Sequence, residues 1–158
     1  MKKNLKKATK AITNILNNFL EDFDCEANFG TDFEYWGGNN VIFYALATPQ
    51  QQTNAFLDFA KNLFPHINAD PFIWSFFHEL GHNQTEEDFT DEEWAEYTHT
   101  VKHLLPGKDD MTYFNLPQEY AATYWAGEYM SSHVKEVSAL LNKLAPAIQN
   151  FYKTMRVK

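Results

Sequence analysis

The segment His78-Glu79-Leu80-Gly81-His82 contains the residue types that bind a metal ion and activate water on it. Histidines four residues apart lie one above the other on an α-helix, so both imidazoles can reach one tetrahedral zinc ion at about 2.0 to 2.1 Å. Glu79 follows the first histidine, so its carboxylate lies beside the ion, where it can take a proton from bound water and pass it to a leaving amine. The spacing predicts hydrolytic zinc chemistry, with His78 and His82 as ligands and Glu79 as general base and acid.

A catalytic zinc site has three protein ligands and one open position, so a third ligand must come from another part of the chain. The spacings of metzincins and of thermolysin-like enzymes lead to Asp88 in place of a histidine, and to Val101 and Lys102. Glu119 is the better candidate, because it falls in the first turn of a predicted helix, where the helix dipole favours an ionised carboxylate. Small residues on the same face would let the histidine helix approach closely: Ala122, Thr123 and Ala126.

Other side chains compete for the third ligand position. Glu86, Glu87 and Asp88 follow the histidine segment directly, and His99 and His103 form a second pair at four-residue spacing. The loop acids would have to fold straight back onto the metal, and the second histidine pair would give an all-histidine site. The sequence also does not decide which residue would donate a hydrogen bond to the oxyanion of a tetrahedral intermediate. The candidates are Tyr113, Tyr120, Tyr124, His99 and His103.

The helix that carries the two histidines is expected to begin at Asp70-Pro71, where an acidic cap precedes a proline at the first helical position. One side of this helix is apolar and the opposite side carries Ser75 and both histidines. The apolar side consists of Phe72, Ile73, Phe76, Phe77 and Leu80. Gly81 lowers helix propensity relative to alanine, so its presence beside a ligand indicates that another backbone packs against it.

The remaining segments predict an α+β fold that is mainly helical and zincin-like. Residues 3–21 are expected to form an amphipathic helix packed on the core rather than on a membrane, and residues 25–47 a small antiparallel sheet. Further helices are expected from a Thr48-Pro49 cap to Phe64, from Thr90 to about Leu105, and from about Leu116 to the C-terminus, with a break before Pro146. No repeat or linker divides the chain, so we expect a single domain over residues 1–158.

Composition excludes several classes of protein. The 158 residues are 44% apolar, which suffices for a core, and a lone cysteine, Cys25, excludes a disulfide framework and a thiolate zinc cluster. No segment is long and apolar enough for a membrane span or a signal peptide, so a cytoplasmic location is expected. The net charge is −8, and no lysine or arginine occurs between Lys10 and Lys61. This distribution argues against direct binding of nucleic acid.

HELGH followed some tens of residues later by Glu119, Ala122, Trp125 and Ala126 resembles the ImmA/IrrE group of small zinc metallopeptidases, which are gluzincins. The resemblance implies zinc held by His78, His82 and Glu119. It also implies a protein or peptide substrate, of which a transcriptional repressor is one candidate. In that group an Asn or Asp usually stands four residues after the ligand glutamate and orients a ligand histidine; here Thr123 occupies this position.

In a second interpretation the protein binds a metal ion but catalyses little or no reaction. The same residues would serve a metal-containing binding or regulatory module, for example a toxin or a repressor-interacting protein. Glu79 favours an enzyme, because a purely structural zinc is normally closed by a fourth protein ligand. The sequence leaves the substrate, the cleavage specificity and the oligomeric state open.

Overall fold

A computed structural model of the chain describes residues 2–46 and 50–156. The helices are α1 (Lys2–Phe19), α2 (Gln50–Leu63), α3 (Pro71–Thr85), α4 (Asp91–Val101), α5 (Asp110–Phe114), α6 (Pro117–Ser132) and α7 (Val134–Arg156), with 3-10 turns at Leu20–Asp22 and Glu86–Asp88. The strands are β1 (Glu26–Phe29), β2 (Glu34–Trp36) and β3 (Val41–Tyr44). The predicted α+β fold, mainly helical with a small sheet, is confirmed.

The sheet is mixed, with the strand order β1-β3-β2. β2 and β3 pair antiparallel through Tyr35 and Ile42, whereas β1 pairs parallel to β3 through Ala27 and the same Ile42. The prediction of an antiparallel sheet is therefore wrong for β1, because the chain crosses to the far edge before the hairpin returns β3 between the two other strands. The outer edge of β1 is covered by Asn17 of α1, whose side-chain amide exchanges two hydrogen bonds with the backbone of Ala27.

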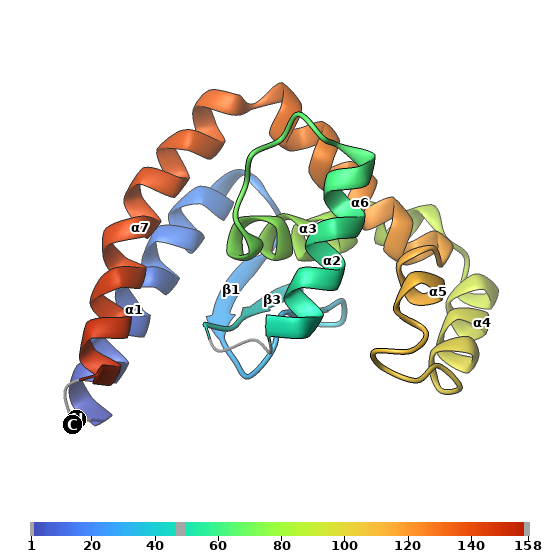
Figure 1. The fold of residues 1–158 in the computed structure, drawn as a ribbon, viewed down its shortest axis with the longest axis horizontal. Coiled ribbons are helices and arrows are strands. Elements are labelled where there is room, and N and C mark those ends of the chain that lie inside the picture. The colour runs from blue at the N-terminus through green and yellow to red at the C-terminus, as the bar shows by residue number, and fades with distance from the viewer. Residues whose placement is uncertain (1, 47–49, 157–158) are drawn as a thin grey trace.

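α1 and α7 run antiparallel along one side of the molecule, so the start of α1 lies near the end of α7 (Figure 1). Their contact is apolar and consists of Ala8, Ile12 and Leu16 on α1 and of Leu140, Leu144 and Phe151 on α7, all buried. This packing confirms the prediction that residues 3–21 form a helix against the core. Within the described ranges, none of the helices combines the length and apolar character needed to cross a membrane.

α3 crosses the centre of the molecule and packs against α6 (Figure 1). The Asp70 carboxylate accepts a hydrogen bond from the Ile73 amide at 2.8 Å, which confirms the predicted start of the helix. A Cβ atom on Gly81 would lie 2.3 Å from the carbonyl oxygen of Ala122. The prediction that another backbone packs against Gly81 is thus confirmed, and that backbone belongs to α6.

Two predictions about helix ends are wrong. The C-terminal helical segment breaks at His133, not before Pro146, which lies inside α7. The His133 ring stacks on Tyr129 and donates through Nδ1 to the Tyr129 carbonyl at 3.0 Å, and this contact closes α6. The helix that begins after the Thr90 capping box ends at Val101 instead of about Leu105, and the short helix α5 was not predicted. The predicted cap at Thr48-Pro49 lies outside the described residues.

Candidate metal centre

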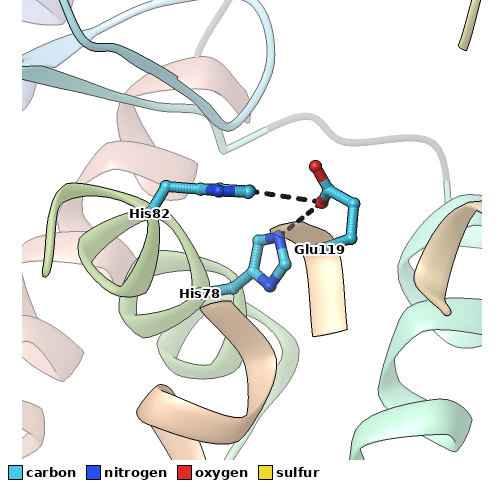
Figure 2. A group of neighbouring side chains, drawn as sticks. All are labelled: His78, His82 and Glu119. Carbon is cyan, nitrogen blue, oxygen red and sulfur yellow. Dashed lines mark hydrogen bonds and ion pairs between the residues drawn. The ribbon is translucent and has the colours of Figure 1, made fainter. Parts of the chain in front are cut away.

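Three of the predicted ligand atoms converge between α3 and α6. Nε2 of His78 lies 3.0 Å from Oε1 of Glu119, and Nε2 of His82 lies 3.2 Å from the same oxygen. Figure 2 shows the two imidazoles directed at one carboxylate oxygen, with the histidines on α3 and Glu119 on α6. All three donor atoms lie within 4.8 Å of one another. The fold thus brings Glu119 to the two histidines, although some forty positions separate it from them in the sequence.

The spacing of these atoms fits a metal ion. Ligands at about 2.0 to 2.1 Å in a tetrahedral arrangement lie roughly 3.3 Å from one another. The distances of 3.0 and 3.2 Å from Glu119 to the two imidazoles are close to that value. Two imidazole nitrogens and a carboxylate oxygen are also the donor types of a catalytic zinc site. The group His78, His82 and Glu119 could therefore hold a metal ion.

Thr123 fixes which nitrogen of His78 faces the group. Its hydroxyl donates to the Glu119 carbonyl at 3.1 Å, within α6, and lies 2.9 Å from Nδ1 of His78. Since the single hydroxyl proton is used on the carbonyl, the oxygen accepts the Nδ1–H of His78. This leaves Nε2 as the ring nitrogen directed at the donor group, 3.0 Å from Oε1 of Glu119. Thr123 therefore stands where a residue orienting the ligand His78 was predicted, and its hydroxyl reaches the ring.

Tyr97 of α4 holds the other side of Glu119. Its phenol donates a hydrogen bond to Oε2, while Oε1 faces the two imidazoles. The carboxylate therefore presents one oxygen to the ion position and keeps the second occupied. Sequence reasoning missed Tyr97; its one signal was Trp94 three residues earlier, an aromatic pair on an otherwise acidic helix. Both side chains turn inward, and the Trp94 indole donates to the Glu86 carbonyl at 3.1 Å.

Charges inside this group shift the pKa values of its members. Burial alone would raise the pKa of Glu119, but the charge of His82 and hydrogen bonds from both imidazoles hold it well below its ordinary value. Burial lowers the pKa of His82, but the charge and the hydrogen bond of Glu119, together with the charges of Glu79 and Glu86, outweigh this effect and raise the pKa to about 9. Without a metal ion, the group is therefore held together by an ion pair between Glu119 and His82.

Glu79 lies beside the donor group and is not part of it. Its side chain is only 8% exposed. Among the residues that the structure describes, no donor makes a hydrogen bond to its carboxylate. Burial raises the pKa of this carboxyl above its ordinary value, and positive charge on His78 and His82 opposes the rise. The residue lines two cavities, so a ligand or a water that enters them can reach this carboxylate.

Two cavities adjoin at Glu79. One, of about 390 Å³, is bounded by Phe56 of α2 and by the segment from Val101 to Phe114. The other, of about 400 Å³, is bounded by β2 and by Trp94 and Tyr97 of α4. Both cavities are lined by Phe33, Glu79, Tyr113 and Glu119. An extended ligand could therefore pass Glu79 with one part in each cavity.

The structure separates the competing residues. Tyr113 lines both cavities, whereas Tyr120 and Tyr124 are exposed on α6 and line neither. His99 and His103 pack edge to face at the surface and also line neither cavity.

Of the acids that follow the histidine segment, Glu86 lines the second cavity, where its carboxylate accepts a hydrogen bond from Tyr35 at 2.8 Å. Glu86, Glu87 and Asp88 are not in the donor group, which Glu119 completes.

The candidate centre thus consists of three donor atoms, two side chains that orient them, and a carboxylate at the junction of two cavities that has no hydrogen-bond partner among the described residues. Comparison of the chain with family models, with curated proteins and with solved structures gave no match. The resemblance to the ImmA/IrrE group remains a prediction from the sequence, and any function must be argued from the side chains of the centre.

Proposed function

We propose that the chain is a zinc-dependent metallopeptidase of the ImmA/IrrE type that hydrolyses a peptide bond in a protein or peptide. The observation that carries the proposal is the position of Glu79. It is a buried carboxylate without a hydrogen-bond partner among the described residues, beside a group of three metal-ligating side chains and facing two cavities. A structural metal site has no use for such a carboxylate.

In this proposal His78, His82 and Glu119 would hold the zinc. Bound zinc supplies a water with a pKa near 7 and polarises the substrate carbonyl. Glu79 takes the proton from the attacking water and passes it to the leaving amine. Thr123 keeps the His78 ring in the tautomer that presents Nε2, and Tyr97 holds Glu119 to a single ligating oxygen. The cavity walls bind the substrate chain on either side of Glu79.

Tyr113 is the candidate for a hydrogen bond to the developing oxyanion. It lines both cavities at Glu79, and a phenol in that position can donate to charge that appears during the reaction. Burial raises the pKa of its phenol, and the charge of Glu119 adds to the rise. The phenol therefore stays protonated at neutral pH and keeps its proton for donation.

The metal site is tested by elemental analysis of purified variants. We expect about one zinc per chain in the wild type and its loss in His78→Ala and in His82→Ala, because each supplies a directional bond that the other ligands cannot replace. His99→Ala is the matched control, since His99 belongs to an exposed histidine pair of the same spacing. Retention of stoichiometric zinc in both ligand variants would remove the site.

Turnover is tested with Glu79→Gln, which preserves shape and cannot accept a proton from water. We expect this variant to keep zinc and fold and to lose cleavage of a proteome-derived peptide library read by mass spectrometry. The zinc-loaded wild type should cut the library, and chelation should stop it. If the zinc-loaded wild type cuts neither peptides nor co-expressed repressors, the metal-containing binding module becomes the better account.

A further inference from the structure

Besides Glu79 and Glu119, five more acidic residues line the two cavities. Asp32, Asp109 and Asp110 line the first cavity, and Glu34 and Glu86 line the second. Among the described residues, no lysine or arginine lines either cavity. Outside the donor group, the charged side chains that line the cavities are therefore carboxylates, and a concave surface lined by charge of one sign focuses its field on whatever enters. An occupant with positive side chains would therefore be favoured.

Three of these five carboxylates already have partners within the protein. Asp109 accepts from the Leu105 amide and Asp110 from the Gly107 amide, both at 2.8 Å, which shapes the loop before α5. Glu86 accepts from the Tyr35 phenol. These three acids support their own loops, and their charge reaches a ligand only as a background field.

Asp32 and Glu34 are the two acids left to meet a ligand. Both are exposed, and no described residue donates a hydrogen bond to either carboxylate. They flank Phe33, whose ring lines both cavities. Asp32 lines the first cavity and Glu34 the second, so each cavity has one open carboxylate. The two acids thus stand on opposite sides of the position at which a substrate would pass Glu79.

Glu79 independently indicates that this junction binds a polar chain. It is 8% exposed and lines both cavities, and within the described part of the protein its carboxylate has no hydrogen-bond donor. A carboxylate in that position lacks its usual partners until a ligand or water supplies them. The acids at the rim therefore surround a site that other observations mark for occupancy, rather than a solvated surface.

We propose that the site selects a basic peptide segment, with lysine or arginine on both sides of the bond that lies at Glu79, and that Asp32 and Glu34 determine this preference. The inference deepens the proposed function and rests on it for the position of the scissile bond. The two carboxylates act on substrate affinity and take no part in the proton transfer.

The test measures binding, so that its result does not depend on turnover. Zinc-loaded Glu79→Gln protein is titrated against fluorescein-labelled dodecapeptides of one alanine-leucine sequence with two lysines, two glutamines or two glutamates flanking the centre. An exposed ion pair changes affinity by about two- to fivefold, so two pairs should favour the lysine peptide over the glutamine peptide by about tenfold. The glutamate peptide should bind most weakly, and added salt should reduce the differences.

Variants locate the effect on the protein. Asp32→Asn and Glu34→Gln should each reduce the preference for lysine by about two- to fivefold. Glu26→Gln is the matched control, because Glu26 is an exposed glutamate on β1 that lines neither cavity. Equal affinity for the three peptides, no measurable binding of the lysine peptide, or the same loss in Glu26→Gln would overturn the inference.

The outcomes also separate this inference from the proposed function. If the protein prefers the lysine peptide through Asp32 and Glu34 but cleaves no peptide, the inference of a basic ligand is supported and the proposal of a peptidase is contradicted. If the protein cleaves a peptide library without enrichment of lysine or arginine around the cut bonds, the proposal of a peptidase is supported and the inference of a basic substrate is contradicted.

Discussion

The α1–α7 pair and the α3–α6 pair are both made of two packed helices, and their interfaces differ in kind. The α1–α7 contact is built from apolar side chains such as Leu16 and Leu144, which are fully buried. The α3–α6 contact is built around a glycine and small residues, with Gly81 directly against the Ala122 carbonyl. The first pair keeps its helices apart by side chains, and the second brings the backbones together.

Between these two helix pairs, the buried polar and charged residues lie in the second. The buried polar side chains among the described residues are His78, Glu79 and Thr85 on α3 and Gln118, Glu119 and Thr123 on α6. Burying such groups is costly unless each finds a partner, so this interface contributes less to stability than an apolar one of the same size. The apolar core contact and the candidate metal centre thus lie in different helix pairs of the same chain, and the following substitutions test that division.

The largest effect on stability is expected in the apolar pair. Leu16→Ala removes a fully buried side chain and should lower the free energy of unfolding of the metal-free protein by about 2 to 5 kcal/mol. Zinc affinity of the folded variant should stay unchanged, because Leu16 touches no part of the donor group. Urea unfolding and a chelator competition measure the two quantities. Asn18→Ala, at an exposed position of the same helix, should leave both unchanged, and a weaker zinc site in Leu16→Ala would break the division.

The second largest effect is expected from a substitution that pushes α3 and α6 apart. Gly81→Ala would ordinarily stabilise a helix, but here the new Cβ would lie 2.3 Å from a backbone oxygen of α6. We expect a loss of about 1 to 3 kcal/mol in unfolding free energy, together with weaker zinc binding, because the histidines move away from Glu119. Gly38→Ala is the control, since a Cβ there meets nothing within 4 Å. Stabilisation by Gly81→Ala would contradict the close contact.

Tyr97→Phe should affect the metal and spare the fold. Removing the phenol frees Oε2 of Glu119, and loss of such an orienting partner typically weakens metal affinity by about 10- to 100-fold. Tyr124→Phe is the matched control, because Tyr124 is 47% exposed and lies outside both cavities. Competition against a chromophoric chelator gives the affinity, and the spectrum of the cobalt-substituted protein reports any change in ligand arrangement. Equal zinc affinities in the two variants would show that Tyr97 does not support the metal site.

The smallest effect is expected at Thr123. Thr123→Val removes the acceptor for Nδ1–H of His78 and should weaken zinc binding by about tenfold, at the lower end of such effects. The loss stays small because Phe56 packs edge-on against the His78 ring, with centroids 5.0 Å apart, and still restrains it. Thr123→Ser keeps the hydroxyl and should restore the affinity in the same competition assay. No loss in Thr123→Val, or an equal loss in Thr123→Ser, would contradict the role of the hydroxyl.

The local chemistry of the centre was readable because it depends on helical periodicity. The pairing of His78 with His82 follows from the length of a helical turn, and the first-turn position of Glu119 follows from Pro117 two residues earlier. Gly81 signalled a close neighbour because glycine inside a helix needs a reason. In each case the indication lay within a few residues of the group concerned.

Tyr97 and the direction of β1 could not be read in this way. Whether the Tyr97 phenol reaches Glu119 depends on how α4 packs, and its own helix gives no sign of that partner. Whether β1 pairs parallel or antiparallel depends on which edge of β3 is free, a choice made by the crossover between strands. The break at His133 instead of near Pro146 likewise depends on a stacking contact with Tyr129.

The sequence by itself determined the donor types, their helical spacing and the apolar faces that bury the helices, because hydrophobic periodicity and capping act over a few residues. Only the tertiary structure decided that Tyr97 holds Glu119, that Asp32 and Glu34 stand at separate cavities, and that Glu79 lies between these cavities without a hydrogen-bond donor from the described part of the chain. These relations join segments distant in sequence, and their geometry depends on how whole helices pack against one another, which no local pattern encodes.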